Sequence, residues 1–215
     1  MDGDSVATTE GSLADETYRT LLDDILAARL SGGAVVQERR LAMRLGVSRS
    51  PMRDALGRLE GQGLLVRNSK GVLTVRVITL KDYLNSLAMR LLIEPAAAAA
   101  ACATIDPARV EALAAMLDAI DADPDPDPAV VWRFDDALHD GIGEASGNPF
   151  MAETITQMRR YTTIFERQRK LGRRKPGLAD HRAILEALSA RDAEGGRHAM
   201  AVHLERVREG VLSTY

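Results

Sequence analysis

The sequence predicts a mainly α-helical protein, in which a winged helix-turn-helix domain (three helices plus a β-hairpin wing) precedes an all-α helical-bundle domain. Aromatic residues make up only 4% of the 215 residues, and a core poor in aromatic side chains favours helices over strands. Apolar residues recur at helical spacing through most of the chain, and two short runs typical of strands fall within residues 64–77. The polar, aperiodic residues 1–14 predict a disordered tail.

The first domain is expected over residues 15–77. Its first helix ends where Ser31, Gly32 and Gly33 interrupt the apolar pattern. Gly46 permits the left-handed backbone of a tight turn between the second and third helices. The expected elements are helices at residues 18–30, 41–45 and 48–61 and strands at residues 64–67 and 72–77.

The third helix has an apolar face and a basic face. Met52, Leu56 and Leu59 share the inner face, whereas Arg49 and Arg53 lie four residues apart on the other. A recognition helix needs this arrangement, because its apolar side packs on the domain while long donors reach base edges or phosphates in the major groove.

Charge is concentrated in the same region. Residues 37–76 carry nine Lys and Arg against three acids, a net charge of +6 in a chain whose net charge is −3. Such a basic block is typical of a phosphate-binding module, and on charge alone a solvated, Arg-rich face is an equal alternative. Lys70 lies at the expected tip of the hairpin, where it is suited to contact the DNA backbone or minor groove. The turn, the basic helix face and the hairpin together favour DNA binding.

The stretch from Leu41 to Leu64, with Leu-Gly-Val-Ser-Arg-Ser-Pro-Met-Arg-Asp-Ala-Leu at its centre, closely resembles the GntR family of bacterial transcription regulators. The resemblance covers residues 15–77 and implies that this domain binds an operator in double-stranded DNA. It implies DNA-contacting arginines and a wing-tip glycine that lets the backbone approach DNA. The resemblance places these residues at Arg39, Arg49, Arg53 and Gly71. Ser48 and Lys70 are added from their positions at the start of the third helix and at the tip of the hairpin.

The second domain is expected over residues 78–215 as a bundle of about six helices. Its first helix contains Pro95, which should kink it. The acidic, proline-rich residues 121–128 form a stiff connection before the third helix. The expected helices cover about 82–103, 107–120, 129–146, 148–171, 177–191 and 193–212.

Four residues of this domain form a candidate metal site. Asp135 and His139 lie one turn apart on a single helix face, and His181 and His203 lie on two other expected helices. Three imidazoles and a carboxylate that converge in a bundle would bind a first-row divalent ion. From spacing alone, the alternatives are a solvated Asp–His pair and histidines at the edge of the core.

Residues 82–215 resemble the FCD effector domain of the FadR subfamily of these regulators. The segments that carry the resemblance are residues 134–139, 145–149, 180–184 and 199–204. The resemblance implies a divalent metal, with zinc expected and nickel or manganese as alternatives. The metal ligands that it implies are Asp135, His139, His181 and His203.

The resemblance also implies that Arg90 reaches a small carboxylate effector beside the metal, because a guanidinium forks onto such a group. The alternative is a salt bridge from Arg90 to Glu94, four residues on. Arg159 and Arg160 are further candidates for the effector site. His198 has no counterpart in the family and is expected at the surface.

These features predict a homodimeric, metabolite-responsive transcription regulator, with repression expected, rather than an enzyme. Two other interpretations are a metalloenzyme fused to a DNA-binding head and a regulator that senses the metal itself. A cytoplasmic protein without membrane attachment is expected, since the N-terminus lacks the layout of a signal peptide and no apolar run reaches roughly 18–20 residues. Cys102, the one cysteine, excludes a disulfide scaffold and is expected in the core.

Overall fold

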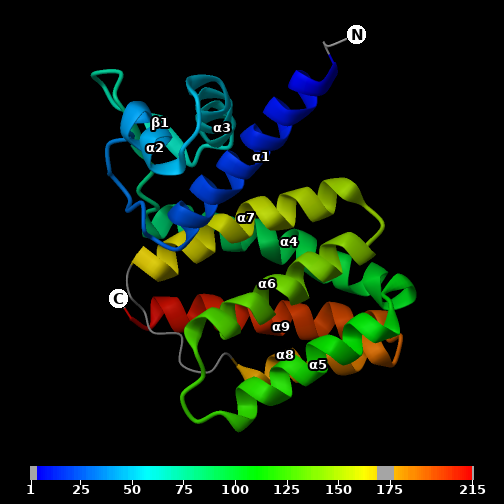
Figure 1. Ribbon diagram of the computed structural model, residues 1–215. Coiled ribbons are helices and arrows are strands. Elements are labelled where there is room, and N and C mark those ends of the chain that lie inside the picture. Colours follow the sequence, from blue (N-terminus) through cyan, green and yellow to red (C-terminus); the bar gives the residue numbers. More distant parts are fainter. Residues whose placement is uncertain (1–3, 169–176, 215) are drawn as a thin grey trace. The chain divides into compact units, whose positions relative to one another are not determined.

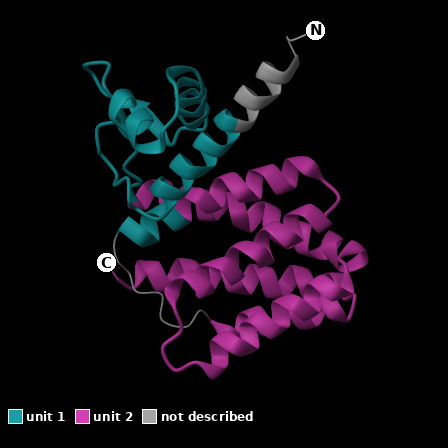
Figure 2. Ribbon diagram, viewed as in Figure 1, with its two compact units in different colours: residues 1–79, 163–170 teal, residues 80–162, 171–215 magenta. Residues whose placement is uncertain are grey.

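The computed structural model describes residues 4–168 and 177–214, of which residues 4–12 are described by their backbone alone. The described residues form nine helices and two strands (Figure 1). A mainly α-helical protein, with a hairpin after its N-terminal helices, is thereby confirmed. Two compact units are present (Figure 2): Met1–Thr79 with Thr163–Lys170, and Leu80–Thr162 with Leu171–Tyr215.

The first helix, α1, spans Asp4–Leu26. The disordered tail expected over residues 1–14 is therefore wrong from Asp4 onwards, and residues 1–3 lie outside the described part of the chain. Once a helix has formed, each further residue adds one hydrogen bond, so a polar segment without an apolar pattern can continue it.

The helix-turn-helix consists of α2 (Glu38–Leu45) and α3 (Arg49–Gly61), and α3 packs on α1. Between them Gly46 has a φ of 65°, and the N–H of Val47 donates to the Ala42 carbonyl at 3.1 Å. A side chain in this left-handed conformation costs about 1–2 kcal/mol, so glycine suits the end of α2. The buried side chains that join these helices include Leu21, Ile25, Met52, Ala55 and Leu59.

The wing consists of β1 (Leu65–Arg67) and β2 (Leu73–Val75), which pair antiparallel. A third segment joins this sheet, because Val35 forms a bridge with Thr74 and the N–H of Val36 donates to the Leu73 carbonyl at 2.9 Å. The sequence pattern does not reveal this segment, since one bridging residue leaves no alternation of apolar and polar positions. The bridge ties the loop before α2 to the wing.

The second unit is a helical bundle, with the end of α7 assigned to the first unit. Its helix α4 packs against α6, α8 and α9, while α5 packs on α6 and α8. Asp106, Asp127 and Asp192 cap α5, α6 and α9 by accepting from N–H groups of the first turn. The helices are α4 (Leu80–Thr104), α5 (Pro107–Ala122), α6 (Pro128–Ala145), α7 (Pro149–Gln168), α8 (Leu178–Ser189) and α9 (Ala193–Leu212).

The alanine-rich helix α4 is the core helix of this unit. It continues through the buried Pro95, and small residues such as Ala98 let α9 approach so closely that a Cβ on Gly196 would lie 2.8 Å from Cys102 Sγ. By length and mean hydropathy (1.4) α4 could also cross a membrane, but half of that stretch is buried inside the protein. Two charged side chains of α4, Arg90 and Glu94, also point inward and are buried.

Candidate functional site

The basic face of α3 is exposed, as a recognition helix requires. Arg49 and Arg53 are exposed, whereas Met52 and Leu59 of the same helix are fully buried. Ser48 occupies the N-cap position of α3, but its side chain makes no capping hydrogen bond. Its exposed hydroxyl therefore remains available to another partner.

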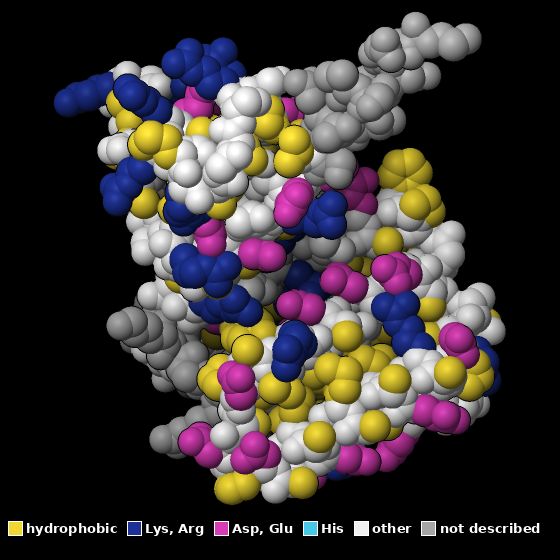
Figure 3. All heavy atoms as spheres, in the orientation of Figure 1, with side chains coloured by type: hydrophobic (Ala, Val, Ile, Leu, Met, Phe, Trp, Pro, Cys, Tyr) yellow, Lys and Arg dark blue, Asp and Glu magenta, His cyan; other side chains and the backbone are white. Residues whose placement is uncertain are grey.

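The other residues expected to contact DNA are also exposed. Arg39 lies in α2 next to Glu38, whose carboxylate accepts a hydrogen bond from Arg53 at 3.0 Å. Lys70 and Gly71 lie at the tip of the wing, where Gly71 has a φ of 75°. Figure 3 shows Lys and Arg side chains gathered over α2, α3 and the wing. Contact of these residues with DNA stays a prediction.

Arg67 braces the wing, a role that the sequence did not indicate. Its guanidinium donates to the Gly71 carbonyl at 3.2 Å and pairs with Glu60 at 2.9 Å. Asn68 adds a second brace, because its side-chain oxygen accepts from the N–H groups of Lys70 and Val72. Two adjacent side chains at the end of β1 thus hold the turn that presents the wing tip.

In the second unit, the four expected metal ligands lie together and are all buried. Asp135 and His139 come from α6, His181 from α8 and His203 from α9, and one ligand atom from each lies within 4.8 Å of the others. We call these four residues the metal cluster. Its side chains could hold a metal ion.

The donor atoms of the metal cluster fit a small divalent ion. Asp135 Oδ1 lies 3.9 Å from His139 Nε2 and 3.7 Å from His181 Nε2, close to the separation of about 3.4 Å between two ligands of a tetrahedral Zn²⁺. His139 Nε2 is buried and has no hydrogen-bond partner among the described residues. A buried nitrogen in that state is destabilising unless a further group binds it.

Burial keeps two of the histidines neutral. It is the main cause that lowers the pKa of His139, with Arg159 and Arg90 lowering it further against the opposing effect of Glu94. Burial and the neighbouring His181 and His139 likewise lower the pKa of His203 well below its ordinary value. Neutral imidazole is the form that binds a metal.

Arg90 makes the salt bridge that was the alternative to effector binding. Its Nε pairs with Glu94 Oε1, and its Nη1 donates to Thr162 Oγ1 at 3.3 Å. The same guanidinium lies beside the metal cluster, with Nη2 3.5 Å from His139 Nδ1. Burial alone would raise the pKa of Glu94, but Arg90 and His139 together lower it, so the pair is ionised.

Arg159 of α7 also reaches the metal cluster. Its Nη2 donates to Asp135 Oδ2 at 2.9 Å and pairs with Asp136, leaving Asp135 Oδ1 facing the histidines. Burial would lower the pKa of Arg159, but the two carboxylates raise it. Arg159 was a candidate for this site from the sequence, but the sequence did not predict which way its side chain points.

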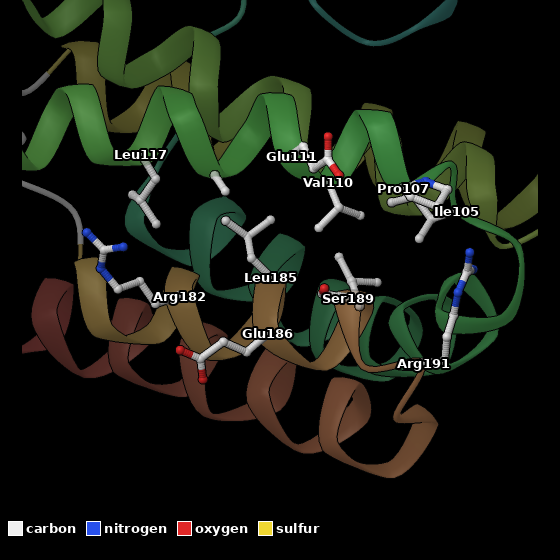
Figure 4. Close-up of a pocket in the computed structure, with 12 residues that line it drawn as sticks. Ile105, Pro107, Val110, Glu111, Leu117, Arg182, Leu185, Glu186, Ser189 and Arg191 are labelled. Carbon is white, nitrogen blue, oxygen red and sulfur yellow. The ribbon is translucent and has the colours of Figure 1, made fainter.

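A separate groove lies between α5 and α8 (Figure 4). It has a volume of about 260 Å³ and a mainly apolar lining, and it contains no residue of the metal cluster. The side chains around it include Val110, Leu117, Arg182, Leu185 and Arg191. His198, expected at the surface, is exposed on α9.

Comparison with known families agrees with this geometry. Residues 13–75 match the gntR family of bacterial regulatory proteins, and residues 85–206 match the FCD domain. The chain is 30% identical over 227 residues to an Escherichia coli K12 protein named for regulation of the L-lactate dehydrogenase operon. This match covers 91% of this chain and 84% of the relative. It is 27% identical over 204 residues to the E. coli transcriptional repressor RspR, covering 91% and 87% of the two chains.

Solved structures show the same fold. E. coli McbR/YncC superimposes with a TM-score of 0.80 at 22% identity, over 94% of this chain and 98% of that one. A GntR regulator from Rhodococcus sp. RHA1 superimposes with a TM-score of 0.74 at 23% identity, over 95% and 99%. The named relatives are transcription regulators, which confirms the expectation of a regulator over that of an enzyme.

Proposed function

The chain belongs to the GntR family of bacterial regulatory proteins that carry an FCD domain, and we propose that it acts as a repressor that responds to a metabolite through a bound metal. It is a DNA-binding transcription regulator, and the proposal concerns what it senses and how it responds. The observation that carries the proposal is the burial of Asp135, His139, His181 and His203 with ligand atoms within 4.8 Å of one another.

For DNA, we propose a homodimer in which each α3 enters the major groove of one half-site. The exposed Arg49 and Arg53 would reach base edges or phosphates, with Ser48 and Arg39 beside them. At the wing, Lys70 and the exposed backbone of Gly71 would contact phosphates or the minor groove. Repression agrees with the name of the relative RspR.

For the metal, we propose zinc, with nickel or manganese as alternatives. Three imidazole nitrogens and one carboxylate oxygen are a donor set that zinc prefers. When bound, a divalent ion would supply a Lewis acid that accepts an oxygen of the effector. Asp135 would bind through Oδ1 while Arg159 holds Oδ2, which fixes the carboxylate in one orientation.

For the effector, we propose a small carboxylate. The buried Arg90 and Arg159 already balance Glu94 and Asp135, so a divalent ion leaves the site with excess positive charge that an anion would offset. Arg90, whose Nη2 lies 3.5 Å from His139 Nδ1, would reach an effector beside the metal. Lactate is the first acid to try, because one relative is named for the L-lactate dehydrogenase operon.

The effector would cause the dimer to release DNA if it binds the arrangement that cannot bind DNA better than the arrangement that can. We place this regulation in the cytoplasm, where the operator is.

The test is thermal unfolding of the as-purified protein with a panel of small carboxylates, before and after chelation. One acid that raises the unfolding midpoint of the metal-loaded protein alone supports the proposal. An acid that raises the midpoint equally after chelation contradicts the metal-dependent part.

A second candidate is that the metal itself is the signal. It is favoured by the pairing of both guanidinium groups at the site with carboxylates, which leaves neither one wholly free for an effector. This alternative expects operator affinity to follow the free metal concentration with no organic acid added. No acid shifting the midpoint, together with strong destabilisation by chelation, would favour it.

A further inference from the structure

We infer that Glu94 is a positioning residue of the metal site, which holds His139 with Nε2 turned toward the metal cluster. The inference rests on the metal site of the proposed function and assigns it a residue outside the ligand set. Glu94 lies in α4, and it is 45 positions from His139 in the sequence. Both side chains are at most 1% exposed.

Arg90 donates to both carboxylate oxygens of Glu94, with Nη2 3.5 Å from Oε2, but only Oε2 contacts His139. Oε1 pairs with Arg90 Nε, and Oε2 lies 2.5 Å from His139 Nδ1. Because an ionised carboxylate only accepts hydrogen bonds, Nδ1 must carry the proton and donate it. The longer approach of Arg90 Nη2 to Nδ1, at 3.5 Å, is then a contact between two donors and no hydrogen bond.

Donation from Nδ1 decides what Nε2 can do. In a neutral imidazole only one nitrogen carries a proton, so Nε2 of His139 presents its lone pair. This is the buried nitrogen without a hydrogen-bond partner among the described residues, and it lies 3.9 Å from Asp135 Oδ1. Glu94 therefore selects the tautomer and ring orientation that a metal ligand needs.

Arg90 and Thr162 hold Glu94 in place. Thr162 Oγ1 accepts from Arg90 Nη1 at 3.3 Å, and Arg90 in turn pairs with Glu94. A chain of side chains thus runs from α7 through α4 to His139 on α6. A carboxylate behind a ligating histidine typically raises metal affinity by about 10–100-fold.

The test is the zinc affinity of the chelated and reloaded full-length protein, measured by competition with a chromophoric chelator. Glu94→Gln keeps the shape of the side chain but loses the charge that favours donation from Nδ1. We expect it to bind zinc about 10–100-fold more weakly than the wild type. The matched control is Asp24→Asn, which also removes a buried carboxylate from arginine pairs, in the first unit. It should lower stability and leave zinc affinity unchanged.

A second readout separates positioning from a general loss of stability. In the chelated wild type, ¹⁵N shifts of the imidazole should show His139 protonated at Nδ1, and in Glu94→Gln they should show a mixture of tautomers. If Glu94→Gln does not fold, Glu94→Asp keeps the charge, withdraws the carboxylate by one methylene and should still weaken zinc binding. A folded variant at position 94 with wild-type zinc affinity would overturn the inference and leave the metal site standing. A wild type that binds no zinc would overturn the metal site and the inference together.

Discussion

The metal cluster depends on histidines that stay neutral. Burial is the first cause of the lowered pKa values of His139 and His203. In the unfolded chain the same side chains titrate near their ordinary pKa of 6.5. Folding therefore changes the affinity of these groups for protons, and stability becomes dependent on pH.

The chelated protein should lose stability as the pH falls below about 6.5, because the unfolded chain then takes up protons that the folded chain refuses. The loss approaches about 1.4 kcal/mol for each histidine and pH unit, and near pH 8 these groups should contribute almost no slope. Urea unfolding between pH 5 and 8 measures this dependence. His203→Gln should flatten the slope, while His198→Gln, at an exposed position of the same helix, should not; equal slopes for the two variants would refute the assignment.

In α3, Arg49 is exposed whereas Met52 is buried, so Arg49 is free to contact DNA. If it reads a base edge, Arg49→Ala should cost about 1–3 kcal/mol of binding to an operator selected from random duplexes. Fluorescence anisotropy at fixed salt measures the change. Arg197→Ala, at an exposed position of α9, is the control and should bind as the wild type does. An unchanged affinity for Arg49→Ala would remove this residue from the recognition surface.

At the scale of elements, the helix-turn-helix depends on how α2 ends. Gly46 has a φ of 65°, and nothing lies within 4 Å of where a Cβ would be. A substitution there is therefore strained by its backbone conformation and not by crowding. Gly57 is exposed and also has open space around its Cβ position. It differs from Gly46 because it lies within the helix α3 and has no left-handed backbone conformation.

Gly46→Ala should destabilise the first unit by about 1–2 kcal/mol, the cost of the left-handed conformation. Gly57→Ala, its matched control, should stabilise by about 0.4–1 kcal/mol, because alanine restricts the unfolded chain and fits a helix. Denaturant unfolding followed by far-UV circular dichroism measures both changes. Two substitutions with the same effect would contradict this account of the turn.

Sequence patterns predict helices and strands well where a single residue or one repeating apolar pattern determines the local structure. The apolar face of α3, the stop at Gly46 and the six helices of the second unit follow from such local signals. The start of α1 was misjudged because residues 4–14 have no apolar period that marks a helix. The bridge of Val35 to Thr74 was missed because the segment before α2 is too short to show an alternation of apolar and polar residues.

At the scale of the whole molecule, the ligand set was easier to predict than its surroundings. The resemblance to a family named all four residues of the metal cluster, and the structure brings them together. The contact of Glu94 with His139 spans two helices, α4 and α6, and no spacing rule connects such positions. The direction of Arg159 depends on the packing of α7, which a single sequence does not encode locally.

The central claim is that the metal cluster holds a divalent metal, which the proposed sensing of the effector requires. Elemental analysis of the purified protein, alongside the His139→Ala/His203→Ala double variant, tests it most directly. We expect close to one equivalent of a divalent metal per chain in the wild type and none in the variant, with operator binding retained because the DNA-binding residues are unchanged. Equal metal content in both proteins, or none in the wild type, would contradict the account.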